Sequence, residues 1–157
     1  RLSNVLTDLM DSGHAGAIAV DSDSPTLPMA YVAEAATVLS GATCDVVLGP
    51  CEDGGYYLVG LRSPQPLLFD GIPWSTDAVF AMTLDRARAQ GLSVHILPQW
   101  FDVDTEADLR RLHADVSTGA HGPQRTYAFV RRLFQPGIAA PSARLTQGTP
   151  AAEGHGP

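Results

Sequence analysis

Apolar residues recur along this chain in two patterns, and each pattern predicts a different kind of secondary structure. Apolar positions at helical spacing predict helices over 1–13, 26–40, 75–90, 105–112 and 125–134. Short apolar runs predict strands over 15–20, 45–48, 56–61 and 94–97. The remaining residues are rich in Pro, Gly, Ala, Ser and Thr without periodicity, which predicts a disordered tail over 135–157.

The alternation of strands and helices predicts a layered α/β domain over 1–134 with a largely parallel sheet. Residues 50–55, between the strands at 45–48 and 56–61, are too few for a helical crossover. These two strands are therefore expected to be antiparallel neighbours or to lie apart in the sheet, which makes the sheet mixed. Ser75 or Thr76 is expected to cap the third helix, and Thr105 with Asp108 forms a capping box for the fourth.

Two of the predicted strands are each followed by a pair of aspartates. Asp21 and Asp23 follow the strand at 15–20, and Asp102 and Asp104 follow the strand at 94–97. Acids in these positions lie at the carboxyl edge of the sheet, where α/β proteins bind ligands. Carboxylates there suit a hard divalent cation that leaves room for phosphate oxygens. Aspartates can also cap helices or begin turns, so the pattern supports two interpretations.

The segment 48–61 carries a further acidic signal. Glu52 and Asp53 sit beside Gly54 and Gly55 between two apolar runs. A glycine pair accepts positive φ and lets a ligand approach the backbone closely, so a carboxylate and bare amides can face one point. The alternative is a β-turn whose acids are solvated.

The overall composition favours a globular protein and argues against binding to nucleic acid. The chain has 157 residues, of which 45% are hydrophobic and 17% are charged, and its formal net charge is -7. General nucleic-acid binding needs a basic surface, whereas a metal ion can offset the phosphate charge of a nucleotide locally. No apolar run approaches the ~20 residues that span a bilayer, and no secretory signal opens the chain. We therefore expect a cytoplasmic protein.

Composition also limits the side chains available for chemistry. All ten basic residues are arginines, which excludes a P-loop lysine and a lysine Schiff base but suits phosphate and carboxylate binding. Cys44 and Cys51 have neither zinc-motif spacing nor a Cys-x-x-Cys arrangement, so we expect both to be small buried fillers.

Four blocks of the sequence, at 20–27, 45–61, 71–77 and 102–109, together resemble a bacterial family of uncharacterised glycosyltransferase-like proteins. Some members of that family are associated with arsenosugar biosynthesis, and its relatives include the guanylyltransferases that make the molybdenum and deazaflavin cofactors. The resemblance covers most of residues 2–112. It implies a three-layer α/β/α GT-A, or Rossmann-like, nucleotide-diphospho-sugar transferase fold with a mixed, mostly parallel sheet.

The resemblance also implies roles for the acidic residues after the strands. It aligns Asp23 with the metal-binding acid of the family and places the second metal acid at Asp104, with Asp102 as its close competitor. Asp21 falls where the family usually has a small residue, and it stays a metal candidate in this chain. The implied cofactor is Mg²⁺ or Mn²⁺, which would neutralise a pyrophosphate leaving group.

Catalytic and substrate-binding residues are expected beside this metal. Asp53, with Glu52 next to it, is the candidate to orient or deprotonate an acceptor hydroxyl. Tyr56 and Tyr57 lie on opposite faces of their strand, so at most one of them faces a ligand. Trp74 can either stack on a sugar or anchor its loop in the core, and the helix amides after it can hold an anionic group. The substrate-binding candidates are Gly54, Gly55, Tyr56, Trp74, Ser75 and Thr76.

Members of the family begin with a strand and a basic, glycine-containing loop that holds the nucleotide, and this chain begins after both. We therefore expect a partial domain without the N-terminal strands, with one unpaired sheet edge and uncovered apolar surface. Such an edge predicts instability or self-association into a homo-oligomer. A compact, stable monomer at low concentration would count against this expectation.

Three functions are compatible with these residues. The first is metal-dependent glycosyl transfer from a nucleotide-diphospho-sugar to a small-molecule acceptor. The second is nucleotidyl transfer, in which a nucleoside triphosphate reacts with a phosphorylated small acid or cofactor precursor and releases pyrophosphate. The third is a catalytically silent module that binds a ligand or partner, for which Mg²⁺ or Mn²⁺ would leave thermal stability unchanged.

Overall fold

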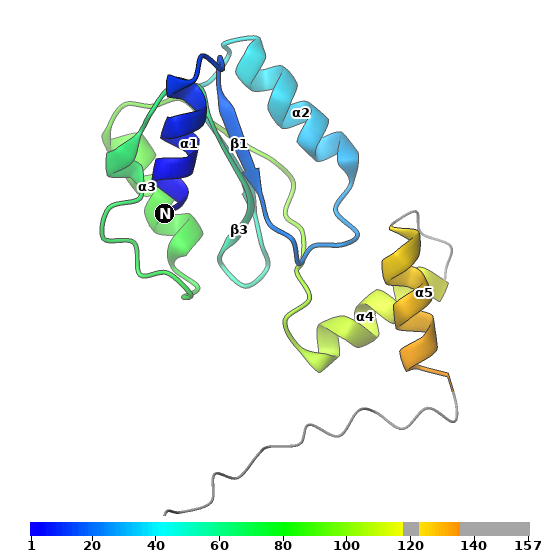
Figure 1. Ribbon diagram of the computed structural model, residues 1–157. Coiled ribbons are helices and arrows are strands. Elements are labelled where there is room, and N and C mark those ends of the chain that lie inside the picture. Colours follow the sequence, from blue (N-terminus) through cyan, green and yellow to red (C-terminus); the bar gives the residue numbers. More distant parts are fainter. Residues whose placement is uncertain (118–122, 136–157) are drawn as a thin grey trace, which may run out of the picture.

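A four-stranded sheet forms the centre of the structure, a computed structural model that describes residues 1–117 and 123–135 (Figure 1). Its strands are β1 (Ala17–Val20), β2 (Val46–Pro50), β3 (Tyr56–Leu61) and β4 (Val94–Ile96), in the order β1-β3-β2-β4. β3 pairs antiparallel with both β1 and β2, whereas β2 and β4 are parallel. The sheet is therefore mixed, as predicted, but two of its three pairings are antiparallel, whereas a largely parallel sheet was expected. β1, β2 and β4 all end at the edge where β3 begins.

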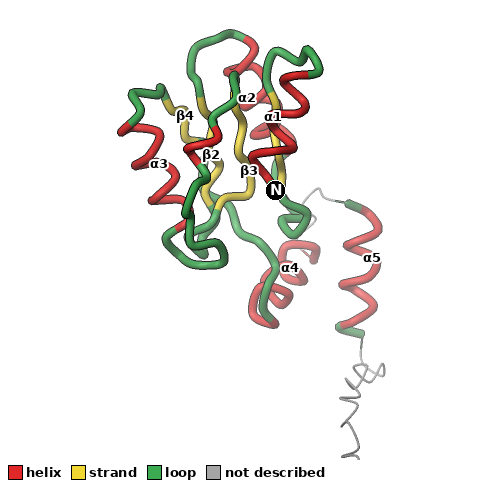
Figure 2. Tube along the Cα trace, turned by 60° about the vertical axis from the view of Figure 1, so that its left-hand side comes forward, coloured by secondary structure: helices red, strands yellow, loops and turns green. Residues whose placement is uncertain are grey.

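Helices cover both faces of the sheet and complete three layers. α1 (Leu2–Asp11) and α3 (Val79–Ala89) pack on one face together with the 3₁₀ helix η1 (Pro66–Leu68), and α2 (Met29–Ser40) packs on the other (Figure 2). The layers agree with the layered α/β domain predicted from the alternation of strands and helices, and with the three-layer α/β/α architecture that the family resemblance implied. η1 was not predicted, because three residues are too few to show a period.

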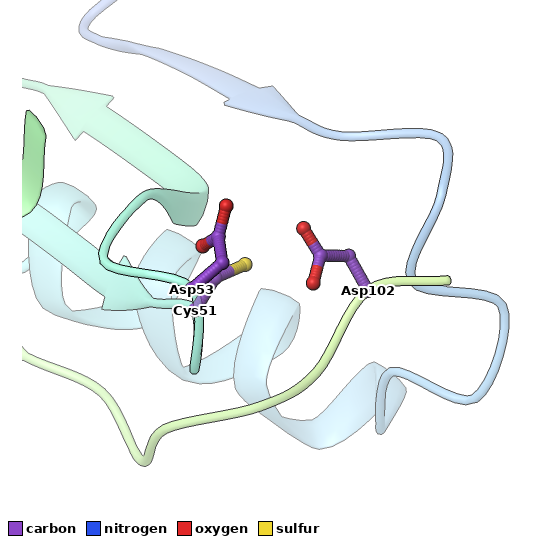
Figure 3. Close-up of side chains that lie close together, drawn as sticks. All are labelled: Cys51, Asp53 and Asp102. Carbon is purple, nitrogen blue, oxygen red and sulfur yellow. The ribbon is translucent and has the colours of Figure 1, made fainter. Parts of the chain in front are cut away.

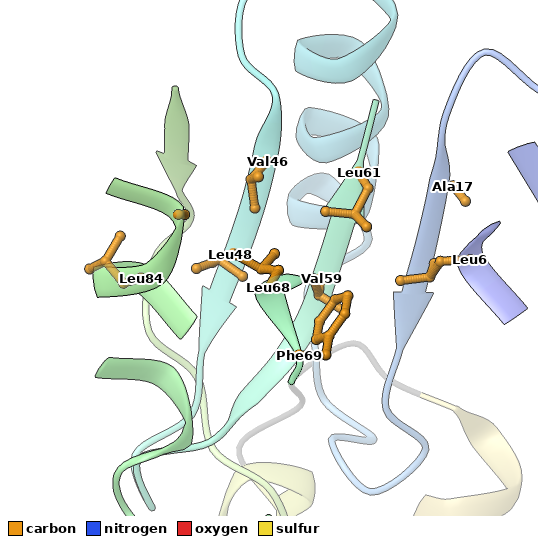
Figure 4. Close-up of a cluster of buried hydrophobic side chains, with 10 residues drawn as sticks. Leu6, Ala17, Val46, Leu48, Val59, Leu61, Leu68, Phe69 and Leu84 are labelled. Atoms are coloured by element: carbon orange, nitrogen blue, oxygen red, sulfur yellow. The ribbon is translucent and has the colours of Figure 1, made fainter. Parts of the chain in front are cut away.

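The central strands are apolar along their length because both of their faces are buried. On one face, Val47 and Leu58 pack against Ala35 and Leu39 of α2. On the other face, alternate residues of β2 and β3 form a larger cluster with α1, η1 and α3 (Figure 4). The members of that cluster are Leu6, Ala17, Val46, Leu48, Val59, Leu61, Leu68, Phe69, Leu84 and Ala87.

A β-bulge interrupts the pairing of β2 with β3 next to the carboxyl edge. Gly49 faces Leu58 whereas Pro50 faces Tyr56, so Tyr57 is an extra residue on β3. Tyr57 is fully buried against α2, and its hydroxyl donates a hydrogen bond of 2.9 Å to a backbone carbonyl oxygen in the loop after β4. Tyr56 packs toward the opposite cluster. The two tyrosines therefore lie on opposite faces, as predicted.

α4 (Glu106–Ser117) and α5 (Gln124–Leu133) pack against each other beside the sheet (Figure 1). They share their own cluster, with Leu112, Val116 and Val130 at its centre. α4 begins with the predicted capping box. The amide and hydroxyl of Thr105 both donate to the Asp108 carboxylate (2.8 and 2.6 Å), and the Asp108 amide donates back to the Thr105 hydroxyl (3.2 Å).

The predicted cap of α3 was wrong. α3 begins at Val79 after Ala78, without a side-chain cap. Ser75 adopts a φ of 65°, and the Thr76 hydroxyl donates to the carbonyl oxygen of Pro73 (2.7 Å), so both residues belong to a turn before the helix. The turn satisfies its own polar groups locally, and the helix therefore starts later than its polar residues suggest.

Other predictions concern the ends and the surface of the chain. The predicted tail, apart from residue 135, lies outside the described residues. None of the helices within 1–117 and 123–135 is both long enough and apolar enough to cross a membrane. β1 forms one edge of the sheet in this part of the chain, and Val5 and Leu9 of α1 are exposed. Self-association of the chain stays a prediction.

Candidate functional site

A cleft of about 600 Å³ opens at the edge of the sheet where β1, β2 and β4 end. Six aspartates line it, and five of them follow strands: Asp21 and Asp23 after β1, Asp53 after β2, and Asp102 and Asp104 after β4. The structure brings these acids together because strands that run in one direction end at one edge. The other lining residues are Cys51, Gly55, Tyr56, Trp74, Ser75, Thr76, Asp77 and Val79. None of these residues carries a basic side chain.

Hydrogen bonds hold the two loops that carry the paired aspartates against each other. The Val103 amide donates to the carbonyl oxygen of Asp23 (2.9 Å), which joins the loop after β4 to the loop after β1. The indole N–H of Trp100 donates to the Thr26 hydroxyl (3.2 Å) between the same two loops. These contacts fix the backbone of both loops independently of any ligand.

The turn between β2 and β3 presents Asp53 to the cleft. The Cys51 amide donates to the carbonyl oxygen of Gly55 (3.0 Å), and the Gly55 amide donates to Asp53 Oδ1 (2.8 Å). Gly54 has a φ of +91°, which L side chains rarely adopt, and its carbonyl oxygen accepts a hydrogen bond from the Phe80 amide of α3 (2.9 Å). The glycine pair therefore closes the turn and joins it to α3.

Asp53 and Asp102 approach each other across the cleft, with Cys51 beside them (Figure 3). A carboxylate oxygen of each aspartate and the Sγ atom of Cys51 all lie within 4.8 Å of one another. Cys51 is buried, as predicted, but it also lines the cleft, which the prediction of a small filler missed. The available signal was its position two residues before Asp53 in the same turn.

The crowded carboxylates disfavour one another's ionisation. The pKa of Asp21 is raised to about 6, chiefly by burial and also by the charge of Asp23, while a hydrogen bond from the Ser24 hydroxyl (2.7 Å) opposes the shift. Burial and the neighbouring aspartates also raise the pKa of Asp102. Burial, followed by the same carboxylates, raises the pKa of the Cys51 thiol. A bound cation would relieve this repulsion.

The donor set fits a hard divalent cation. Mg²⁺ and Mn²⁺ prefer carboxylate oxygens and leave positions for water or phosphate oxygens. These acids do not cap helices, because Thr105 and Asp108 cap α4 and α2 has no side-chain cap. Asp21 and Asp53 do accept local hydrogen bonds within their turns, from Ser24 and Gly55, as the alternative interpretation allowed. The residues that would hold the cation are Asp21, Asp23, Asp102 and Asp104. Metal binding itself stays a prediction.

Asp21 gives the metal-free protein a specific pH dependence. Its folded-state pKa lies above the ordinary value of 3.8, so its ionisation costs stability as the pH rises from about 4 through 6. We expect the thermal midpoint of the wild type, measured with a chelator, to fall relative to that of Asp21→Asn over this interval. Added Mg²⁺ should reduce the difference. If the difference between the two thermal midpoints did not change from pH 4 to 7, Asp21 would not titrate in this interval.

Glu52 lies outside the cleft lining. Its carboxylate accepts two hydrogen bonds from the Arg111 guanidinium of α4 (2.7 and 3.1 Å), which lowers the pKa of Glu52. The same guanidinium lies over the Phe101 ring, 3.8 Å from its centre. Arg111 therefore links α4 to the neighbours of Asp53 and Asp102, and the geometry gives no support to the predicted catalytic role of Glu52.

Arg111→Ala should loosen the two loops that face each other across the cleft. We expect faster amide hydrogen exchange over residues 52–54 and 101–104, because the ion pair and the ring contact hold both segments to α4. Arg110→Ala is the matched control, since Arg110 pairs with Glu106 on its own helix. Equal exchange in the two variants would mean that Arg111 does not hold these loops.

Aromatic side chains form an apolar wall of the cleft. The Trp74 and Tyr56 rings meet edge to face with centroids 6.4 Å apart, and Trp74 also stacks with Phe69 at 6.4 Å. Trp74 is nevertheless 48% exposed. Trp74 is therefore held by two rings but is not buried in the core, and its stacking on a sugar stays a prediction.

Comparison with known proteins places this fold in a wider class. Residues 1–76 match the model of a family described as "Uncharacterized protein conserved in bacteria (DUF2064)". A crystal structure of a "putative nucleotide-diphospho-sugar transferase" from Desulfovibrio desulfuricans G20 is 34% identical to this chain, with a TM-score of 0.73. The similarity covers 84% of this chain and 57% of that protein, so the chain spans less than two thirds of its length. No curated protein is significantly similar to the chain.

These similarities confirm the predicted fold class, the GT-A-like fold of nucleotide-diphospho-sugar transferases. They also support the predicted resemblance to a bacterial family, whereas the arsenosugar type stays a prediction. The family match includes Asp21, Asp23 and the turn that carries Asp53, and it ends at Thr76, before the loop with Asp102.

Proposed function

We propose that this chain carries the cation-binding and acceptor-facing part of a transferase that moves a sugar from a nucleotide-diphospho-sugar to a small-molecule acceptor. The observation that supports this proposal most is the convergence of six aspartates on one cleft without a basic side chain in its lining. Phosphate oxygens alone would be repelled by these carboxylates, so a divalent cation must accompany them. A nucleotide diphosphate with its metal ion meets that requirement.

The aspartates after β1 and β4 would hold the cation. Asp23, Asp102 and Asp104 supply carboxylate oxygens from two loops that are hydrogen-bonded to each other, and Asp21 lies beside them. Mg²⁺ or Mn²⁺ bound here would neutralise the charge of the departing diphosphate. Because the loops are already fixed in place, the carboxylates need little rearrangement to bind the ion.

Asp53 would face the acceptor. The Gly55 amide holds its Oδ1 atom at 2.8 Å and so fixes the orientation of the carboxylate. In this orientation Asp53 would position an acceptor hydroxyl or take its proton. Gly54 and Gly55 have no side chains, so the acceptor can approach the backbone of the turn closely.

The aromatic wall would bind the flat surface of a sugar or base. Trp74 and Tyr56 line the cleft together with Ser75 and Thr76, whose hydroxyl and amide groups can form hydrogen bonds with sugar hydroxyls. This mixture of ring faces and small polar groups suits a carbohydrate better than a purely apolar ligand.

Product analysis tests the proposal. The full chain would be incubated with Mn²⁺ or Mg²⁺, a panel of nucleotide-diphospho-sugars and small hydroxylated acceptors, and products would be identified by mass spectrometry. The expected result is metal-dependent release of a nucleoside diphosphate and glycosylation of an acceptor. Pyrophosphate release from a nucleoside triphosphate would favour nucleotidyl transfer instead. Absence of turnover, together with thermal stability that no divalent ion changes, would favour a silent binding module.

A further inference from the structure

Cys51 is a thiol in a cleft whose other candidate ligands are all oxygen atoms. It follows β2 directly and is bridged to Trp100 of the loop after β4, so its backbone is fixed on both sides. Its side chain is 4% exposed, and within the described residues its sulfur has no hydrogen-bond partner. A buried thiol that lines an acidic cleft without a polar partner has its lone pairs available to a ligand.

The position of the sulfur relative to the carboxylates is that of a ligand set. Sγ and one oxygen from each of Asp53 and Asp102 lie within 4.8 Å of one another (Figure 3). Two atoms bound to one tetrahedral Zn²⁺ lie about 3.5 Å apart, so side-chain movements of about 1 Å would bring the Cys51 sulfur and an Asp102 oxygen onto one ion. Catalytic zinc sites use three protein ligands and keep one position for water or substrate. Cys51 and Asp102 would supply two of these ligands, and Asp23 or Asp104 of the same cleft lining would supply the third, so Asp53 remains available to face the acceptor.

We propose that Cys51 is a sulfur ligand of the cation site and gives this site a preference for thiophilic divalent metals such as Zn²⁺ and Cd²⁺ over Mg²⁺. The inference rests on the proposed function, because it concerns the metal of the same cleft. Thiolate selects zinc-like ions, whereas carboxylate and water alone suit Mg²⁺ and Mn²⁺. The sulfur binds as a thiolate, so its proton is released to solvent when the metal binds.

The chain offers a matched control for this thiol. Cys44 is the other cysteine of the sequence, is buried to a similar degree at 5% exposure, and does not line the cleft. Cys44→Ser therefore removes one buried thiol while it leaves the proposed ligand in place. Cys51→Ser replaces the proposed sulfur ligand by a hydroxyl oxygen, and Cys51→Ala removes the ligand without a substitute.

Titration with Cd²⁺, followed by ultraviolet absorption of the sulfur-to-cadmium charge transfer, tests the proposal. The wild type and Cys44→Ser should both show a saturable band. Cys51→Ser should lack the band and bind Cd²⁺ on the order of tenfold more weakly or worse, while its affinity for Mn²⁺ changes little. An unchanged band in Cys51→Ser, or loss of the band in Cys44→Ser, would overturn the assignment.

X-ray absorption at the zinc edge of the wild type and of Cys44→Ser shows whether sulfur is bound to the metal, and it needs no variant of Cys51. One sulfur atom in the first coordination shell of both proteins is expected. A shell of oxygen and nitrogen alone would refute the role of Cys51 and leave the proposed transferase intact, provided that Mn²⁺ still binds. If no divalent ion bound to the protein, both the role of Cys51 and the metal dependence of the proposed transferase would be refuted.

Discussion

Replacement of Asp102 by asparagine is expected to reduce transfer activity on the order of a hundredfold or more. Asp102 faces Asp53 and Cys51 within 4.8 Å and is flanked by Asp104 on the same loop. An asparagine keeps the shape of the side chain but removes the negative charge, so it weakens the hold on a cation that must neutralise the leaving diphosphate. The initial rate of nucleoside diphosphate release at saturating Mn²⁺ measures the effect.

Asp85→Asn is the control for this substitution. It removes the same charge from α3, where the Asp85 side chain is 79% exposed and lies outside the cleft lining. The rate of this variant should equal that of the wild type. Wild-type activity in Asp102→Asn, in a protein with an unchanged thermal midpoint, would exclude Asp102 from the metal site and would favour Asp104 and Asp23 as ligands.

Gly54→Ala is expected to destabilise the fold by at least about 3 kcal/mol, because it combines a strained φ with a steric overlap. Gly54 has a φ of +91°, and a Cβ atom there would lie 2.6 Å from the Cα atom of Asp77. The overlap is with backbone, so no side chain can rotate away to relieve it. The turn must shift, and Asp53 shifts with it. The midpoint of urea unfolding measures the loss of stability.

Gly13→Ala separates the two contributions. Gly13 has a φ of +99°, close to that of Gly54, but a Cβ atom there would meet nothing within 4 Å. Only the cost of a left-handed alanine is expected, about 1–2 kcal/mol. If both variants lost the same stability, the overlap with the Asp77 backbone would add nothing to the cost of Gly54→Ala. The packing of Asp77 against the turn would then be loose enough to accept a Cβ atom.

The sheet and its helices were predictable because each element carries its own local pattern. The connection predicted between β2 and β3, residues 50–55, was too short for a helical crossover and allowed an antiparallel pair. The capping box of Thr105 and Asp108 marks the start of α4 in the sequence. The start of α3 was missed because the Thr76 hydroxyl bonds to residues before the helix, donating to Pro73 and accepting from the amide of Ala78, and not to an amide within α3. A sequence does not distinguish these two uses of one hydroxyl.

The acidic part of the cleft was predictable, and its finer geometry was not. Aspartates after strands that run in one direction must meet at one edge, so Asp21, Asp23 and Asp102 could be grouped from their positions alone. Glu52 and Asp53 are adjacent in sequence, yet one pairs with Arg111 and the other lines the cleft. The partner of Glu52 is 59 residues away, and a local pattern carries no information about that contact.

Titration of Mn²⁺ into the metal-free protein, with free Mn²⁺ measured by electron paramagnetic resonance, shows whether the acidic cleft binds a divalent cation. We expect saturable binding to the wild type at neutral pH, wild-type binding in Asp85→Asn, and strongly weakened binding in Asp102→Asn. Free Mn²⁺ that rises in proportion to total Mn²⁺ throughout the titration, with and without a nucleotide diphosphate, would show that the cleft is not a cation site.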